Sequence, residues 1–220
     1  MRPALSSVGS FEITVNKWAN KESAPLRKCK IDGVSYFLPN TYEEETKCGE
    51  CGQVRMLKAI NKDTKQVVVI TRVSLISLRT GKISADIAKS AYREFVLLGL
   101  VKHPNIINLI HAYTPNYAKG TLKELYLITP FVSNTLHNRL RSKEAFKDVE
   151  ILNIIYKLLD GLDYLHKFKI VHRNLNPKSV GLNENGDPVI FDFGLTRLIT
   201  KNATTNDAGI PVYMWHRKFY

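Results

Sequence analysis

A regular repeat of apolar residues marks the segment from Asp148 to Lys167. Apolar side chains recur there at three- and four-residue steps, which is the spacing of one face of an α-helix. The stripe consists of Ile151, Ile155, Leu158, Leu162 and Leu165. We expect one long amphipathic helix with Asp148 as its N-cap. No Glu or Gln stands three residues after Asp148 to complete a capping box, so the placement depends on the periodicity.

A second helix is predicted from Ser84 to Leu100. One face carries Ile87, Ala91, Phe95 and Leu98. The sequence His103-Pro104-Asn105 stops it, because proline cannot continue a helix.

Short runs rich in β-branched residues and bounded by turn residues predict strands elsewhere. The expected strands are 54–59, 67–73, 106–112, 124–129, 170–171, 179–182 and 189–191. Asn61-Lys62-Asp63 and Glu184-Asn185-Gly186-Asp187 are expected to be turns. Strands and two amphipathic helices together predict an α+β fold, whereas residues 1–33 have little periodicity and favour a flexible, basic N-terminal extension.

The composition narrows the possible classes of protein. A chain of 220 residues with 44% hydrophobic composition can bury a core. The longest aliphatic run, Val67–Ile70, is too short to span a bilayer, and the first residues lack a secretory apolar stretch, so we expect an intracellular, soluble protein without a membrane partner. The formal charge is +12. Because the basic residues are scattered among acids without a register of aromatic residues, the charge argues against a nucleic-acid partner and leaves acidic proteins open.

The three cysteines are Cys29, Cys48 and Cys51. Their number argues against a secreted disulfide framework. Cys48 and Cys51 form a C-x-x-C, but the sequence supplies no second pair of ligands for zinc and no strand–helix setting for a redox site. We therefore expect ordinary loop cysteines and no metal site there.

Two motifs follow the long helix in a specific order. His172-Arg173-Asn174-Leu175-Asn176-Pro177 comes first, and Asp192-Phe193-Gly194 follows after a short predicted hairpin. Their order resembles the catalytic loop and the metal-binding D-F-G of protein kinases. The helix sequence Tyr92-Arg93-Glu94 and the segment 102–107 add to the resemblance, which covers the chain from about Tyr36 onward.

The closest likeness within that superfamily is to the mitogen-activated protein kinases, particularly the stress-activated branch. It is carried by residues 37–42 (FLPNTY), 91–94 (AYRE) and 113–115 (YTP). Cyclin-dependent kinases remain the nearest alternative. The resemblance implies a bilobal fold, with a small antiparallel β-sheet lobe and hinge over 34–132. A partial, helical large lobe would occupy 133–220 and end in the activation segment.

The resemblance assigns nucleotide-binding roles to Gly49, Gly52, Val54, Thr71, Glu94, Thr129 and Val132. Thr71 occupies the position of the family's lysine. That lysine binds the phosphates and pairs with the glutamate at the position of Glu94, and the hydroxyl of Thr71 cannot replace its positive charge. Arg72 is adjacent, but successive strand residues point to opposite faces, so Arg72 would have to bulge inward to substitute for the lysine.

The catalytic positions of the family map onto Arg173, Asn174 and Asn176. Asn174 replaces the aspartate that acts as general base, and a neutral amide cannot accept the substrate's proton. Asn176 replaces the lysine of the catalytic loop. The implied metal ligands are Asp192 and, in place of an asparagine, Ser179. The resemblance implies ATP and Mg²⁺ as cofactors, and their binding by this degenerate site stays open.

The activation segment carries a second set of substitutions. Aligning Trp215-His216-Arg217 with the family motif W-Y-R puts Ala208-Gly209-Ile210 at the phosphorylation motif, so both phosphoacceptors are missing. The helices of a complete large lobe would come after Tyr220. We therefore expect an exposed apolar patch on this truncated large lobe.

These observations favour a catalytically impaired, mitogen-activated-protein-kinase-like protein, or pseudokinase. We expect it to bind signalling partners, such as a related kinase or an upstream activator, in the cytoplasm or nucleus. A residual serine/threonine kinase that uses Asp192 and Arg72 is one alternative. A non-functional truncated product is the other.

Overall fold

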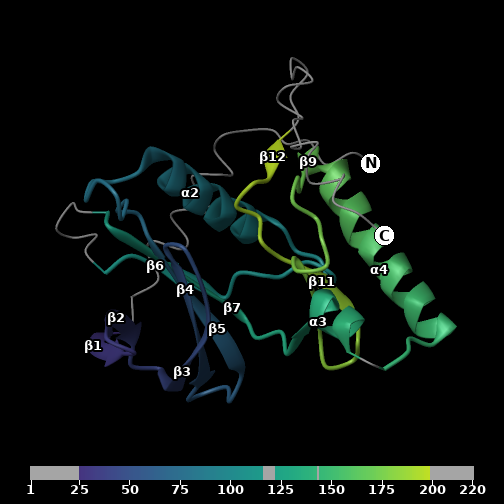
Figure 1. The fold of residues 1–220 in the computed structure, drawn as a ribbon, viewed down its shortest axis with the longest axis horizontal. Coiled ribbons are helices and arrows are strands. Elements are labelled where there is room, and N and C mark those ends of the chain that lie inside the picture. Colours follow the sequence, from purple (N-terminus) through teal and green to yellow (C-terminus); the bar gives the residue numbers. More distant parts are fainter. Residues whose placement is uncertain (1–24, 116–121, 143, 199–220) are drawn as a thin grey trace. The chain divides into compact units, whose positions relative to one another are not determined.

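The computed structural model describes residues 25–115, 122–142 and 144–198 (Figure 1). The described chain divides into two compact units. The first unit runs as far as Leu100 and also includes Asn108–Phe131, and the second unit comprises Val101–Ile107 and the chain from Val132 onward.

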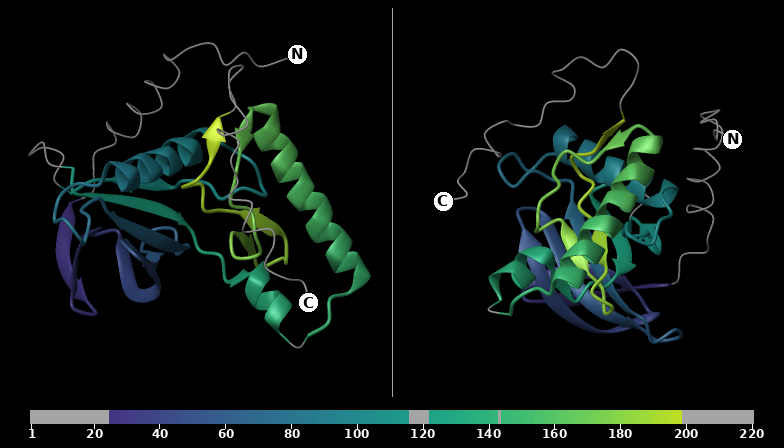
Figure 2. Two further views of the ribbon diagram at one scale, coloured as in Figure 1. Left: turned by 45° about the horizontal axis from the view of Figure 1, so that its top comes forward. Right: turned by 90° about the vertical axis from the view of Figure 1, so that its right-hand side faces the viewer.

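The first unit is built on a five-stranded antiparallel sheet in the order β3-β4-β5-β7-β6. Its strands, drawn from purple to teal in Figures 1 and 2, are β3 Tyr42–Cys51, β4 Val54–Asn61, β5 Val67–Ser74, β6 His111–Tyr113 and β7 Glu124–Pro130. A separate hairpin consists of β1 Leu26–Ile31 and β2 Val34–Pro39. The strands predicted at 54–59, 67–73 and 124–129 therefore form.

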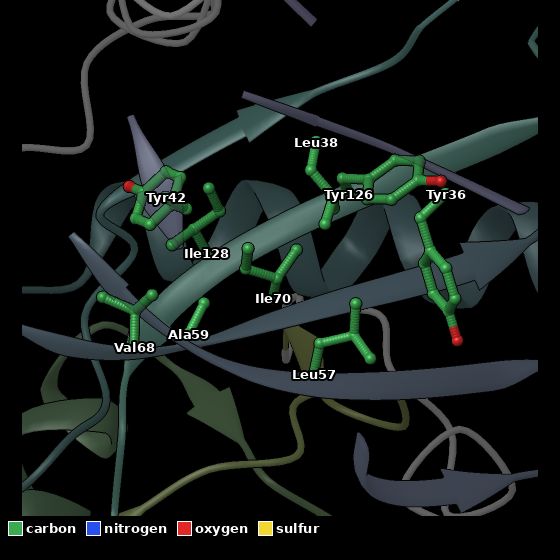
Figure 3. Close-up of a cluster of buried hydrophobic side chains, with 9 residues drawn as sticks. All are labelled: Tyr36, Leu38, Tyr42, Leu57, Ala59, Val68, Ile70, Tyr126 and Ile128. Carbon is green, nitrogen blue, oxygen red and sulfur yellow. The ribbon is translucent and has the colours of Figure 1, made fainter. Parts of the chain in front are cut away.

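One face of this sheet holds the main core of the first unit. The side chains of Val68 and Ile70 point to the same side of β5 and are almost completely buried. They pack with residues of β2, β3, β4 and β7 (Figure 3). The cluster is Tyr36, Leu38, Tyr42, Leu57, Ala59, Val68, Ile70, Tyr126 and Ile128. Because β2 contributes Tyr36 and Leu38, the hairpin β1–β2 is fastened to this face by apolar contact.

Helix α2, Ala85–Leu100, packs against the opposite face of the sheet. Val73 lies an odd number of residues from Val68 and Ile70 along β5, so its side chain points to the other face. It joins Leu75 and Ala91 of α2 in a second buried cluster. The predicted helix at 84–100 is confirmed to within one residue.

The second unit contains α3 Leu136–Arg141, α4 Asp148–Lys167 and two small antiparallel sheets. One sheet has the order β11-β10-β8 and the other has β12-β9. The strands are β8 Asn134–Thr135, β9 Ile170–Val171, β10 Val180–Leu182, β11 Pro188–Ile190 and β12 Arg197–Leu198. Helix α4 is the long green helix of Figure 1 and has the predicted bounds.

The N-cap of α4 differs from the prediction. Lys147, with extended backbone, occupies the cap position, and Asp148 is the first helical residue. This shift by one residue places Glu150 three residues after the cap, where its Oε2 accepts a hydrogen bond from the Lys147 N–H at 3.5 Å. The sequence predicted no capping box for a helix capped by Asp148, but with Lys147 as the cap this capping-box contact is present.

The buried face of α4 also differs from the predicted stripe. Ile154, Gly161 and Leu165 are buried, whereas Ile151 and Ile155 of the stripe are 40% and 49% exposed. Other exposed apolar side chains on the same helix are Val149, Leu152, Tyr156 and Leu159. Apolar residues cover more than one face of this helix, so periodicity alone could not choose which face is buried.

Other expectations are corrected by long-range pairing. Leu26–Ile31, expected to belong to the flexible extension, is a strand because it pairs along its whole length with β2. The strand predicted at 106–112 is split, since Ile106 bridges to Ile190 in the second unit and only His111–Tyr113 pairs with β7. The cysteines lie on β1 and β3 rather than in loops.

Residues 1–24 lie outside the described residues, so the remainder of the extension stays a prediction. Within the described ranges, no helix is long and apolar enough to cross a membrane.

Candidate functional site

The segment 172–179, which we call the 172–179 loop, connects β9 to β10 in the second unit. His172 anchors it. Its ring is 3% exposed, Nε2 lies 2.9 Å from the Phe191 carbonyl oxygen, and Nδ1 accepts the Asn174 backbone N–H at 3.3 Å. With one nitrogen donating and the other accepting, the ring is a neutral imidazole. Burial lowers the pKa of His172, while the Phe191 contact and the Asp192 charge act in the opposite direction.

His172 also connects the loop to the segment after β11. Its ring meets the ring of Phe193 edge-on, with the centroids 5.0 Å apart, and Phe193 is fully buried. The neighbouring residues Arg173 and Asp192 both have φ of 68°, in the left-handed region that non-glycine residues seldom adopt. The packing of His172 and Phe193 therefore holds two unusual backbone positions close to the predicted catalytic residues.

The three substituted polar residues of the loop are hydrogen-bonded to one another. Asn176 Nδ2 donates to the Asn174 carbonyl oxygen at 2.8 Å and to Asn174 Oδ1 at 3.4 Å. Ser179 Oγ accepts the Asn176 N–H at 2.9 Å and lies 3.0 Å from the carbonyl oxygens of Asn174 and Asn176. The loop thus uses Asn174, Asn176 and Ser179 to satisfy its own polar groups.

Asp192 is joined to this network through Asn174. Asn174 Nδ2 donates a hydrogen bond to Asp192 Oδ2 at 3.0 Å. Asp192 and Asn174 therefore come together as the motif order predicts, and Asn176 and Ser179 lie beside them. The Asn174 amide has no basic group that could take up a substrate proton.

The implied Mg²⁺ ligands do not fit a metal site. Ser179 is 1% exposed, and its hydroxyl is engaged with the Asn176 N–H and with two backbone carbonyls. One oxygen of Asp192 faces an N–H donor. In the part of the chain that the structure describes, no group of three His, Cys, Asp or Glu residues could hold a metal ion. Mg²⁺ requires oxygen ligands in near-octahedral geometry, and only Asp192 presents a charged one.

Thr71 and Arg72 lie in the middle of β5 in the first unit. Both residues are paired without a break, Thr71 with Met56 and Leu127 and Arg72 with Arg55 and Tyr126. No bulge turns Arg72 to the face of Thr71. The guanidinium of Arg72 instead forms an ion pair with Glu124 and lies 5.7 Å from the centre of the Tyr36 ring. Arg72 therefore faces the side of the sheet that carries the main core.

Glu124 is a site-related residue that the sequence reasoning missed. Its Oε2 accepts the Tyr126 hydroxyl at 3.0 Å, and that hydroxyl accepts the Phe37 N–H at 3.3 Å. The side chains of Arg72 and Glu124 are only 13% and 18% exposed. The presence of Arg72 and Glu124 in two predicted strands could have suggested an ion pair. The sequence does not show that β5 and β7 are neighbours in the sheet, and that pairing brings the two side chains together.

The glycine positions form the hairpin β3–β4. Gly52 has φ of 57° and makes the turn, which explains the requirement for glycine there. At Gly49 a Cβ atom would stand 2.6 Å from Met56 Cε, so the end of the Met56 side chain lies over this glycine. Lys47 forms an ion pair with Glu50, which also pairs with Arg55.

The remaining predicted nucleotide positions are spread over both units. Val54 begins β4, Thr129 pairs with Val69 near the end of β7, and Glu94 lies half-buried on α2. Val132 belongs to the second unit, where its Cγ1 would clash with a Cβ atom on Gly181. Gly181 was not predicted from the sequence as a site residue. A glycine within an otherwise apolar strand could have indicated this close contact.

The activation-segment substitutions at Ala208-Gly209-Ile210 and the motif at 215–217 lie outside the described residues. They stay predictions.

Comparison with known families gives a match to the model described as protein kinase domain over residues 42–215. The matched range includes the glycine hairpin, β5, the 172–179 loop and Asp192.

Comparison with characterised proteins finds mitogen-activated protein kinases. Mitogen-activated protein kinase 13 of Homo sapiens is 32% identical over 190 residues, which are 86% of this chain and 49% of the relative. Mitogen-activated protein kinase p38b of Drosophila melanogaster is 28% identical over 201 residues, or 90% of this chain and 52% of the relative. The chain spans about half the length of these relatives.

Proposed function

This chain belongs to the protein kinase family, and we propose that it is a catalytically impaired, mitogen-activated-protein-kinase-like member that acts by binding signalling proteins. The family predicted from the motifs is confirmed. The observation that carries the proposal is the network of Asn174, Asn176 and Ser179, because all three catalytic or metal positions are used to satisfy the loop itself.

The first supporting argument concerns the general base. Phosphoryl transfer in this family depends on positioned charges rather than on covalent chemistry, so each missing charge removes part of the catalysis. Loss of a positioned base costs about 10²- to 10⁴-fold in rate, or roughly 3 to 5 kcal/mol of barrier. The Asn174 amide donates to Asp192 and cannot serve as that base.

The second supporting argument concerns the phosphate-gripping lysine. Thr71 stands in its place, and the neighbouring Arg72 is committed to Glu124 and to the Tyr36 side of the sheet. Turning Arg72 around would break a largely buried ion pair and leave Glu124 without its counter-charge, which is costly. A residual kinase that recruits Arg72 is therefore disfavoured, and no contact of the described residues favours that alternative.

The third part of the proposal concerns the cofactors. Protein kinase domains in general use ATP and Mg²⁺. Gly52 keeps the backbone conformation of a glycine-rich turn that could cover phosphates. On that ground we propose residual ATP binding without phosphoryl transfer.

Partners and location complete the proposal. The similarity to mitogen-activated protein kinases supports signalling proteins as partners, with a related kinase or an upstream activator first among them. We propose the cytoplasm or nucleus as the location. Titration of the immobilised chain with purified mitogen-activated protein kinase 13 tests the first choice of partner. A binding signal that saturates is expected, and its absence rejects this partner.

The central test is a phosphoryl-transfer assay on the purified chain with radiolabelled ATP, Mg²⁺ and an added mixture of protein substrates. We expect incorporation no higher than that of an Asp192→Ala variant. Robust transfer that Asp192→Ala abolishes would overturn the proposal. The variant Thr71→Lys/Asn174→Asp restores two of the missing charges. Comparing its phosphoryl transfer with that of the unaltered chain tests whether these two substitutions limit the activity.

A further inference from the structure

We propose that the Asn174 side chain takes the place of a divalent cation at Asp192, so that the carboxylate is satisfied internally and the chain does not bind Mg²⁺ at this point. The inference deepens the proposed function and rests on it in one respect, the assignment of Asp192 to the family's metal position. It predicts that any nucleotide binding by this chain is independent of divalent cations.

The contact between the two side chains is directional. Asn174 Nδ2 donates to Asp192 Oδ2 at 3.0 Å, so the positive end of an N–H dipole faces one of the two carboxylate oxygens. Asn176 Nδ2 donates to Asn174 Oδ1 at the other end of the amide. Rotating the amide by half a turn would place two oxygens together at Asp192 and two NH₂ groups together at Asn176. The neighbours therefore fix the donor toward Asp192.

The second implied ligand is unable to compensate. A metal-bound Ser179 Oγ would have to leave the Asn176 N–H that it accepts at 2.9 Å and the two loop carbonyls beside it. Ser179 is 1% exposed, so those backbone groups would lose their partner away from water, which costs free energy. Asp192 is left as a single exposed carboxylate, and one carboxylate is a weak ligand for an ion that keeps its water reluctantly.

The second unit contains a similar pair elsewhere. Asn153 Nδ2 donates to Asp187 Oδ1 at 3.1 Å, but there Lys157 also forms an ion pair with the carboxylate. Asp187 thus has a cation from the protein and Asp192 has an amide. A change of asparagine to aspartate would place two carboxylates together at either position. Among the described residues, a lysine forms an ion pair at Asp187 and none forms one at Asp192. This difference provides a matched control.

The first experiment uses the unaltered full chain and the metal alone. ¹⁵N-labelled chain is titrated with MnCl₂, and paramagnetic line broadening is followed at the amides around Asp192 and around Asp187. We expect no broadening centred on Asp192 beyond that at other exposed carboxylates. Selective broadening there at submillimolar Mn²⁺, lost in an Asp192→Asn variant, would overturn the inference.

The second experiment compares Asn174→Asp with Asn153→Asp. Two adjacent carboxylates repel one another, and a bound dication relieves that repulsion, so Asn174→Asp is expected to bind Mn²⁺ at least about tenfold more tightly than the unaltered chain. Asn153→Asp is expected to change Mn²⁺ binding less than about twofold. An Asn174→Asp chain that folds, judged by circular dichroism, and gains no more than Asn153→Asp would overturn the inference.

Failure of this inference and failure of the proposed function are separable. Mn²⁺ binding by the unaltered chain without phosphoryl transfer would refute the inference alone, whereas transfer that requires Asp192 would refute the proposed function.

Discussion

The ion pair between Arg72 and Glu124 can be tested as a structural element that excludes Arg72 from catalysis. Glu124→Gln removes the counter-charge while keeping the shape of the side chain. Removing one partner of a fully buried pair costs about 3–5 kcal/mol, because the other charge stays buried alone. Since the two side chains retain 13% and 18% exposure, water screens part of that penalty. We therefore expect Glu124→Gln to lower the free energy of unfolding by about 2–3 kcal/mol.

Two further variants complete a double-mutant cycle and separate the effect of the charges from the effect of packing. Arg72→Met alone should cost a comparable amount, because it leaves Glu124 without its cation and removes the guanidinium from the Tyr36 ring. Arg72→Met/Glu124→Leu removes both charges and should lie within about 1 kcal/mol of the unaltered chain, since apolar residues often replace a buried ion pair without loss.

The assay is urea unfolding followed by far-ultraviolet circular dichroism, because both tryptophans, Trp18 and Trp215, lie outside the described residues. The coupling free energy is the cost of the double variant minus the sum of the single costs. A Glu124→Gln chain within 0.5 kcal/mol of the unaltered one, on the order of the error of such cycles, would refute the reasoning, and Arg72 would then be available to turn toward Thr71.

Two further predictions concern the second unit. Gly181→Ala should lower the free energy of unfolding by about 1–3 kcal/mol, because its Cβ would meet Val132 Cγ1. Val132→Ala in the same chain should recover most of that loss in urea unfolding, and purely additive costs would contradict the clash. Burial lowers the pKa of His172 in the folded chain. The contribution of neutral His172 to the free energy of unfolding is therefore complete above the unfolded pKa of about 6.5, and it decreases as the pH falls toward the folded pKa. His172→Gln should flatten the stability profile between pH 7 and 5, and a variant profile with the same slope as that of the unaltered chain would exclude His172 as the cause.

Much of the fold could be predicted because its signals are local. The bounds of α4 and the approximate bounds of α2 follow from the spacing of apolar residues, and strands β4, β5 and β7 of the five-stranded sheet follow from β-branched runs between turns. The pairing of β1 with β2 and the split of the predicted 106–112 strand depend on partners elsewhere in the chain. Local propensity carries no information about such partners, so these two expectations were wrong.

The candidate site divides in the same way. The sequence by itself determined which residue types stand at the family's catalytic positions, including Asn174 for the general base and Thr71 for the lysine, because motif identity is read residue by residue. It could not determine what those side chains contact. The amide of Asn174 might have faced solvent, and Arg72 could have bulged inward, without any change in the sequence pattern.

Only the tertiary structure decided those contacts. The continuous pairing of β5 on both sides fixes Arg72 on the Glu124 side, and the packing of His172 against Phe193 holds the loop where Asn174 meets Asp192. Both outcomes depend on segments that are distant in the chain and adjacent in the fold. The sequence determined which residue types stand at the positions of the kinase motifs, and the structure determined that Asn174, Asn176 and Ser179 are hydrogen-bonded to one another.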